Sequence, residues 1–317
     1  MVRSSPSGPR SLVLRASAKV NLALEVLGRR PDGYHEIATV LQAIDLSDRL
    51  VLEDADGGIE LRCDTPAIPT DRQNLAWRAA DLLRRAAGVA RGVRIRLWKR
   101  IPVAAGLGGG SSDGAAVLYG CNRLWRLGWD TARLATLATE LGMDVPFFLR
   151  GGRALATGRG EILRPLPPAP GLTLVIVNPG VPLSTREVYA RAPGDLRGDG
   201  TRVAALIGAL DRGPRAVAAA LHNALEGVVE RRCPVLGELK AALAKAGALG
   251  CVMSGSGPTV VGVAASARHA RAIREALGPS PWASWVVRTL PGRAVGALRV
   301  APEWAGASGP LEGGEAE

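Results

Sequence analysis

The chain has few aromatic residues, few lysines and few cysteines, and it contains no long hydrophobic run. Aromatic side chains make up 4% of its 317 residues, so the core must be built from Ala, Val, Leu and Ile. No stretch approaches the roughly 18 apolar residues of a membrane span. The first ten residues, MVRSSPSGPR, offer no apolar segment for a signal peptide. We therefore expect a soluble, cytoplasmic protein with no membrane partner.

The four cysteines form no CxxC pair and predict no metal site. A disulfide framework is uncommon in a chain of this length. We expect reduced thiols at Cys63, Cys121, Cys233 and Cys251.

The net charge is +11, which could indicate a nucleic-acid partner. The arginines are spread along the chain, and lysine occurs only at Lys19, Lys99, Lys240 and Lys245. Without a basic run we expect no nucleic-acid binding, although charge keeps that alternative open. Excess positive charge would also favour a polyphosphate substrate through long-range steering.

Hydrophobic periodicity predicts helices alternating with strands, hence an α+β fold. The predicted single strands cover 12–27, 92–103, 172–179 and 284–290. A hairpin is predicted within 48–62, short strands within 147–166, and two strands joined by a glycine turn within 250–264. The predicted helices cover 74–87, 111–128, 130–142, 201–211, 214–231, 235–247 and 267–277. Four prolines within 165–170 mark a domain boundary, giving domains at 11–165 and 166–301. The tails at 1–10 and 302–317 are predicted to be flexible.

A glycine-rich segment, PVAAGLGGGSS, lies between a predicted strand and a predicted helix. Its glycines leave backbone N–H groups uncovered, and the following helix adds the positive end of its dipole. These features predict a site for a di- or triphosphate, at which Ser111 and Ser112 could add hydroxyl donors or help to hold Mg²⁺. The segment is neither a P-loop nor a Rossmann loop, because Gly-Lys-Ser/Thr and the GxGxxG spacing are both absent. The residues of this predicted site are Pro102, Val103, Ala104, Ala105, Gly106, Leu107, Gly108, Gly109, Gly110, Ser111 and Ser112.

The segment PVAAGLGGGSSDGAA resembles the second signature of the GHMP kinases, with Gly114 where alanine is more usual. The resemblance implies that the residues of this site bind ATP, with the loop wrapped around its phosphates and Mg²⁺ as the cofactor. It also implies the family's fold: an amino-terminal domain like ribosomal protein S5 domain 2 and a ferredoxin-like carboxy-terminal domain, with ligands in the cleft between them.

Two further segments supply candidate catalytic residues. SAKVNLALEVLGRRPDGYHEI resembles the amino-terminal signature of a GHMP kinase branch in which Lys19 and Asn21 face the reacting hydroxyl. In GMDVPFF, Asp144 lies between apolar residues at a predicted helix-to-strand corner, and a buried acid needs a partner. We expect Asp144 to accept the alcohol proton and Lys19 to keep it ionised. The sequence assigns no metal ligand; Met143 replaces a small residue of the family motif.

The segment RRPDGYHE resembles the GHMP kinases that act on 4-diphosphocytidyl-2-C-methyl-D-erythritol, in which these residues hold the cytosine. The resemblance implies Tyr34 and His35 as substrate-binding residues. Tyr189 is the candidate for the other face of the base, with Thr185 beside it. The implied reaction transfers a phosphoryl group from ATP to the 2-hydroxyl of this substrate, in the non-mevalonate route to isoprenoid precursors.

A third segment, VMSGSGPT, resembles the third GHMP signature. We expect its residues Ser254, Gly255, Ser256 and Gly257 to support the nucleotide loop, although a plain hairpin turn would also explain the glycines.

Two alternative functions stay open: a GHMP kinase with another acceptor, such as homoserine or mevalonate, and a catalytically silent ligand-binding member. We expect the protein to be a monomer or a weak homodimer.

Overall fold

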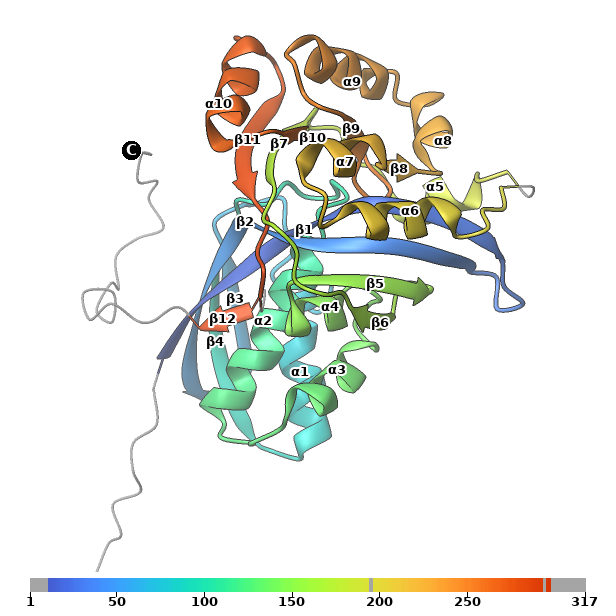
Figure 1. The fold of residues 1–317 in the computed structure, drawn as a ribbon. Coiled ribbons are helices and arrows are strands. Elements are labelled where there is room, and N and C mark those ends of the chain that lie inside the picture. Colours follow the sequence, from blue (N-terminus) through green and yellow to red (C-terminus); the bar gives the residue numbers. More distant parts are fainter. Residues whose placement is uncertain (1–10, 194–195, 293–294, 298–317) are drawn as a thin grey trace, which may run out of the picture.

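The computed structural model describes residues 11–193, 196–292 and 295–297, so the tails predicted at 1–10 and 302–317 lie outside it. Two sheets with packed helices form the described part, as the α+β prediction required. The long strands β1 (Ser11–Arg29) and β2 (His35–Asp56) cross the middle of the molecule in Figure 1, with one lobe above them and one below.

The larger sheet is organised around the antiparallel pair of β1 and β2. The register of the pair shifts between Ser17 and Lys19 and again between Asn21 and Ala23. Such bulges re-aim side chains, and here they flank the segment that carries Lys19 and Asn21. The remaining strands described for this lobe are β3 (Ile59–Cys63), β4 (Arg91–Trp98), β5 (Arg153–Gly158) and β6 (Ile162–Pro165).

The hairpin predicted within 48–62 is wrong. β4 pairs antiparallel with β2, and β3 runs parallel to β4 on its far side. The turn at 57–58, between β2 and β3, crosses the start of β4, where the Val93 N–H donates to the Gly58 carbonyl over 3.1 Å. A Cβ on Gly92 would overlap the carbonyl oxygens of Gly57 and Gly58, so glycine at 92 permits this crossing.

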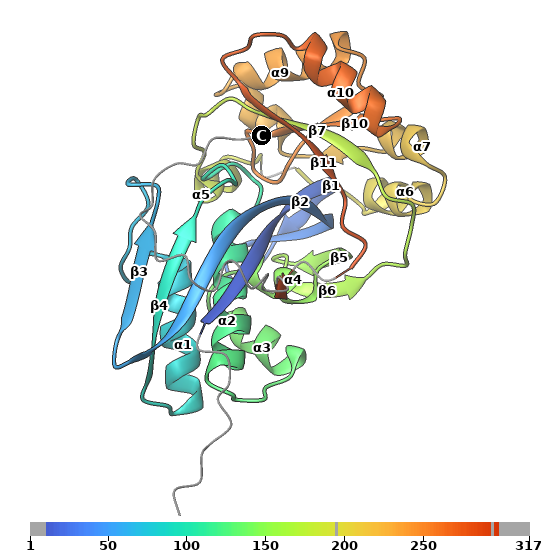
Figure 2. The ribbon, with the colours of Figure 1, turned by 90° about the vertical axis from the view of Figure 1, so that its left-hand side faces the viewer.

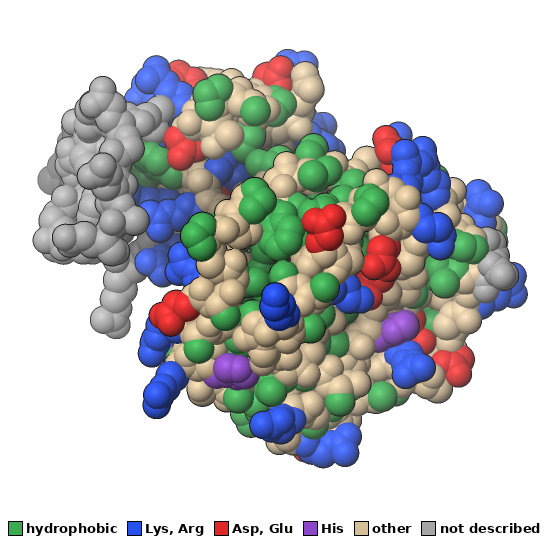
Figure 3. Space-filling view, turned by 90° about the horizontal axis from the view of Figure 1, so that it is seen from above, with side chains coloured by type: hydrophobic (Ala, Val, Ile, Leu, Met, Phe, Trp, Pro, Cys, Tyr) green, Lys and Arg blue, Asp and Glu red, His purple; other side chains and the backbone are tan. Residues whose placement is uncertain are grey.

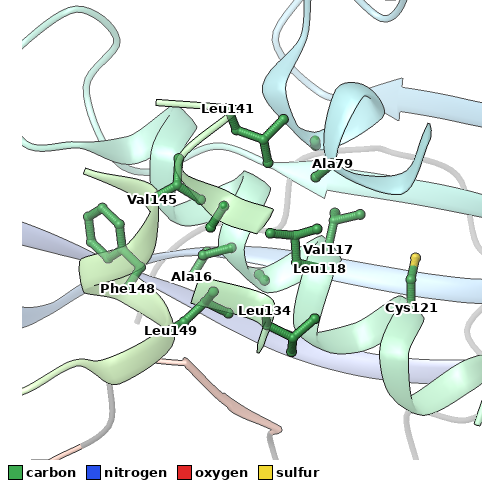
Figure 4. Packing of buried hydrophobic residues seen from close by; sticks show 14 of the residues in the cluster. Ala16, Ala79, Val117, Leu118, Cys121, Leu134, Leu141, Val145, Phe148 and Leu149 are labelled. Carbon is green, nitrogen blue, oxygen red and sulfur yellow. The ribbon is translucent and has the colours of Figure 1, made fainter. Parts of the chain in front are cut away.

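Four helices cover one face of the larger sheet, as Figure 2 shows for the first three. They are α1 (Leu75–Ala87), α2 (Gly109–Leu124), α3 (Thr131–Ala138) and α4 (Val145–Arg150). The Asn74 side chain caps α1 and the Asp130 side chain caps α3. Their buried side chains, with those of the strands, form one apolar core, part of which is shown in Figure 4.

The short strands predicted within 147–166 are confirmed as β5 and β6, but the prediction that Asp144 occupies a helix-to-strand corner is wrong. Residues 145–150 form the short helix α4, and Asp144 is its N-cap residue. Pro146 lies in the first turn, where its missing N–H has no intrahelical partner to lose. The apolar residues 145–149 of this helix, among them Phe147 and Phe148, are buried.

The upper lobe contains an antiparallel sheet in the order β11-β7-β10-β9. Its strands are β7 (Thr173–Asn178), β9 (Cys251–Met253), β10 (Val260–Ala264) and β11 (Ala283–Arg288). Its helices are α5 (Thr185–Ala190), α6 (Thr201–Ala209), α7 (Pro214–Ala219), α8 (Glu226–Glu230), α9 (Val235–Lys245) and α10 (Ala267–Ala276). The strands predicted around 173–178, 251–264 and 284–288 are confirmed.

The single helix predicted at 214–231 is wrong, because the short strand β8 (His222–Asn223) separates α7 from α8. β8 pairs in parallel with residues 23–24 of β1. The Asn223 amide donates to the carbonyls of Met253 and Gly255, both over 2.8 Å, which holds this break in place.

β1 joins the two lobes. Besides β8, it pairs with β12 (Val295–Ala297), which follows the upper sheet in sequence. The domain boundary at 165/166 therefore stays a prediction. Leu166 lies just past the end of β6, and the described chain crosses to the upper lobe through a segment without helix or strand.

No described helix is long and apolar enough to cross a membrane. All four cysteines fall in the described part and none forms a disulfide, as predicted. On the face seen in Figure 3 the Lys and Arg side chains are scattered over the surface and do not form one stripe.

Candidate active site

A cavity of about 1170 Å³ holds most of the predicted site residues together. Its lining includes Lys19 and Asp144, most of the glycine-rich segment, and the pair Tyr34 and His35. Thr185 and Tyr189 line the same cavity from the opposite lobe. The volume exceeds that of a typical single-ligand pocket, so the cavity has room for two substrates.

The glycine-rich segment connects the end of β4 to the start of α2. Gly106 and Gly108 have φ of 75° and 71°, a region that favours glycine. Neither position has room for a side chain: a Cβ on Gly106 would overlap the Ser254 carbonyl oxygen, and one on Gly108 would lie 2.8 Å from the Phe148 ring. Gly108 caps α2 without a side-chain hydrogen bond, which leaves the first N–H groups of a 16-residue helix open to an anion.

Two residues of the predicted ATP set do not line the cavity. Leu107 is fully buried, and its carbonyl accepts from the Lys19 N–H over 3.0 Å. Ser112 is also fully buried, and its hydroxyl donates to the Ser17 carbonyl over 2.7 Å. Their side chains hold the segment in place, whereas Ser111 faces the cavity.

Lys19, Asn21 and Asp144 form the polar centre of the cavity. Lys19 is buried; its Nζ donates to Asn21 Oδ1 over 2.7 Å and lies 3.6 Å from Asp144 Oδ2. The Asp144 side chain is 35% exposed and makes no capping hydrogen bond to α4. Its carboxylate is therefore paired with a cation yet open to a ligand.

Thr39, which the sequence did not single out, orients this centre. Its hydroxyl donates to the Ala23 carbonyl over 2.7 Å and accepts from Asn21 Nδ2 over 2.8 Å. The Asn21 carbonyl oxygen is thereby turned toward Lys19. A threonine in a buried strand carries no local signal for such a role.

The third glycine segment contacts both the centre and the nucleotide loop. Ser254 Oγ donates to the Gly106 carbonyl over 2.9 Å and accepts from the Asn21 N–H over 3.2 Å. A Cβ on Gly255 would lie 3.1 Å from Asn21 Oδ1 and 3.3 Å from Lys19 Nζ. The segment thus packs directly against the groups that it was predicted to support.

Aromatic and imidazole rings gather around another part of the cavity. The rings of His35 and Tyr189 lie 5.4 Å apart with a tilt of 37°, and the Arg159 guanidinium lies 5.0 Å from the ring of the exposed Tyr34. Partial burial, then the charge of Arg29, lowers the pKa of His35. A neutral imidazole offers one donor and one acceptor nitrogen.

Tyr189 and Thr185 both come from α5. Burial, and then the charge of Asp144, raises the pKa of Tyr189, so its phenol stays neutral. The hydroxyls of Thr185 and Ser256 lie 2.8 Å apart, which links α5 to the third glycine segment.

Three buried charged residues that the sequence did not single out lie beside the loop. Lys99 Nζ bonds to both Asp48 and Asp113, the latter over 2.7 Å. Burial raises the pKa of Asp113 to about 7; Lys99 opposes the shift and Asp48 adds to it. Burial alone would lower the pKa of Lys99, but the two carboxylates raise it. Within the described residues no group of three or more His, Cys, Asp or Glu could hold a metal.

Comparison with known proteins places the chain among kinases. Residues 74–152 match the GHMP kinases N terminal domain and residues 203–284 match the GHMP kinases C terminal family. A 4-diphosphocytidyl-2-C-methyl-D-erythritol kinase of Pelotomaculum thermopropionicum is 50% identical over 260 residues, covering 81% of this chain and 91% of the relative.

Comparison with solved structures also finds kinases. A 4-(cytidine 5'-diphospho)-2C-methyl-D-erythritol kinase superposes with a TM-score of 0.75 at 42% identity, covering 88% of this chain and 99% of that one. Homoserine kinase from Cytophaga hutchinsonii superposes with a TM-score of 0.73 at 22% identity, covering 93% of this chain and 99% of that one. At this identity the likeness concerns the fold alone. The predicted GHMP kinase fold is confirmed, and the chain belongs to the GHMP kinases, within their 4-diphosphocytidyl-2-C-methyl-D-erythritol kinase family.

Proposed function

We propose that this protein transfers the γ-phosphoryl group of ATP to the 2-hydroxyl of 4-diphosphocytidyl-2-C-methyl-D-erythritol, giving the 2-phosphate and ADP. The reaction belongs to the non-mevalonate route of isoprenoid precursor biosynthesis. One observation carries the proposal: a single cavity contains the Lys19–Asp144 pair, the glycine loop and the His35–Tyr189 ring pair. The 50% identity to a kinase named for this substrate supports the choice of acceptor.

In the proposed mechanism Asp144 accepts the proton of the acceptor hydroxyl as its oxygen attacks the γ-phosphorus. Lys19 keeps the carboxylate ionised and offsets charge on the transferring phosphoryl group. Asn21 fixes the Lys19 ammonium through their 2.7 Å hydrogen bond. The separation of 3.6 Å between Lys19 Nζ and Asp144 Oδ2 suits a ligand-free site, because catalytic contacts tighten when substrates bind.

The open N–H groups at the start of α2 would hold the ATP phosphates in line with the acceptor. Magnesium commonly keeps several waters and needs only one or two protein oxygens beside the substrate phosphates. Ser111 lines the cavity, and its hydroxyl is a donor that fits such an ion. The ion would neutralise charge on the β- and γ-phosphates.

For the acceptor, His35 would hydrogen-bond the edge of the cytosine while Tyr34 and Tyr189 supply flat faces. Tyr34 is 55% exposed, so a base would cover a ring that is now open. Thr185 would hold the diphosphocytidyl group from the side of α5. A cytoplasmic location and a monomer or weak homodimer remain predictions.

Replacing Asp144 by Asn tests the mechanism. Asp144→Asn should lower turnover with the cytidyl acceptor by about a hundredfold to ten-thousandfold, because general-base help of that size is lost. Binding of ATP should change little. The measurements are ADP release under saturating substrates and calorimetric titration with ATP.

The exposed Asp211→Asn variant is a matched control, since it makes the same chemical change away from the cavity. It should turn over like the wild type. Near-wild-type turnover in Asp144→Asn would remove Asp144 from the mechanism. ATP binding without any ADP release by the wild type would instead favour a catalytically silent member.

A further inference from the structure

The buried group of Asp48, Lys99 and Asp113 has no part in the mechanism above, although it lies beside the nucleotide loop. Asp48 is fully buried on β2, Lys99 follows β4, and Asp113 lies near the start of α2. Lys99 and Asp113 both line the cavity. Burying three charges is costly unless they are paired and hydrogen-bonded to one another.

The group connects the two ends of the glycine loop. At the beginning, Asp48 Oδ1 accepts from the N–H groups of Arg100 and Ile101 over 2.6 Å and 2.9 Å. At the end, Asp113 Oδ2 accepts from Lys99 Nζ over 2.7 Å. A Cβ on Gly109 would lie 3.0 Å from the Ile101 side chain and 3.3 Å from Lys99 Nζ, so the two ends are in close contact.

One atom of the group is unsatisfied. Asp113 Oδ1 is inaccessible and has no hydrogen-bond partner in the described part of the chain. An unpaired buried acceptor is unfavourable, and most for an ionised carboxylate. Protonation of Asp113 would relieve this cost.

The surroundings favour that protonation. Burial is the largest cause that raises the pKa of Asp113 to about 7, with Lys99 opposing and Asp48 adding to the shift. The remaining titratable neighbours lie at the end of β3: Asp64 accepts from the Lys99 N–H over 3.0 Å, and burial raises the pKa of the Cys63 thiol. Because the folded pKa exceeds the unfolded one, ionisation of Asp113 costs stability as the pH rises through about 7.

We propose that Asp113 is a positioning residue for the nucleotide, which acts through Lys99 to hold the end of the glycine loop against its beginning. The inference rests on the proposed role of that loop in binding ATP.

Two variants at one position separate geometry from charge. Asp113→Ala removes the hydrogen bond to Lys99 and should weaken ATP binding about tenfold, the value of one charge-assisted hydrogen bond. Asp113→Asn keeps an acceptor for Lys99 but carries no charge. It should restore most of the affinity.

The experiment is calorimetric titration of the full chain and of each variant with ATP and Mg²⁺. Hydrogen exchange of the amides at 103–110 should quicken in Asp113→Ala. Val117→Ala, a fully buried change on the same helix, controls for lost stability and should bind ATP normally.

Wild-type affinity in both Asp113 variants would overturn the proposal. So would an equal loss in both variants, because the acceptor that Asn keeps for Lys99 would then have no effect on ATP binding. Failure of the wild type to bind ATP would overturn this proposal and the proposed function together. ATP binding without turnover of the cytidyl acceptor would overturn the proposed function alone.

Discussion

At the scale of single residues, the polar centre is held by partners that leave its reactive group free. Lys19 donates to Asn21, and Asn21 is fixed in turn by Thr39 and Ser254. Asp144 takes no capping role in α4. The carboxylate therefore keeps an oxygen for the substrate while a buried ammonium stabilises its charge.

The ring of Tyr189 allows a prediction about the acceptor. Stacking of a base on an aromatic ring contributes about 1–3 kcal/mol, so Tyr189→Ala should raise the acceptor KM by at least about fivefold. The KM for ATP should not change. Steady-state kinetics with each substrate varied in turn make the comparison.

Tyr119→Ala, on α2 and outside the cavity lining, is the matched control for loss of a tyrosine. An acceptor KM that is the same in Tyr189→Ala and in the wild type would rule out the stacking role.

Most residues of the site could be predicted from sequence because they lie in short segments with recognisable patterns. Lys19, Asp144, His35 and Tyr189 come together in one cavity as the motifs indicated. Thr39, Asn223 and the three buried charges could not be predicted. Their roles depend on partners that are far away in sequence, and no local pattern reports such contacts; Lys99, for example, follows Asp48 by 51 positions.

At the scale of elements, the glycine loop depends on space as much as on backbone freedom. Gly106 has φ of 75° and no room for a Cβ, because the Ser254 carbonyl occupies that space. Gly128 has φ of 69° with nothing within 4 Å. The two positions share backbone strain but differ in crowding.

We therefore expect Gly106→Ala and Gly128→Ala to behave differently. Each should lose about 1–2 kcal/mol of stability from the left-handed conformation. Only Gly106→Ala should also displace the third glycine segment and lower kcat/KM for ATP by more than about tenfold, equivalent to 1.4 kcal/mol. Denaturant unfolding and initial rates give the two quantities. Equal activity in both variants would show that the crowding has no catalytic consequence.

The elements that sequence mispredicted share a physical cause. A strand at 59–63, an apolar helix at 145–150 and the break at 222–223 are all decided by tertiary packing. Short apolar runs do not distinguish a buried strand from a buried helix. Helices with clear caps, such as the one that begins after Asn74 and ends before Gly88, were predicted to within a residue.

At the scale of the whole molecule, β1 carries Lys19 and pairs with segments from both halves of the chain. The cavity consequently takes its walls from both lobes. The same fold occurs in homoserine kinase at 22% identity, so architecture alone does not select the acceptor. The selection must come from side chains such as His35 and Tyr189.

The most direct test of the account is therefore ADP release by the purified protein with Mg-ATP and 4-diphosphocytidyl-2-C-methyl-D-erythritol, compared with homoserine, mevalonate and galactose. The account predicts turnover with the cytidyl compound alone and a product heavier by one phosphoryl group. Turnover with another alcohol, and none with the cytidyl compound, would contradict the roles given to Tyr34, His35 and Tyr189.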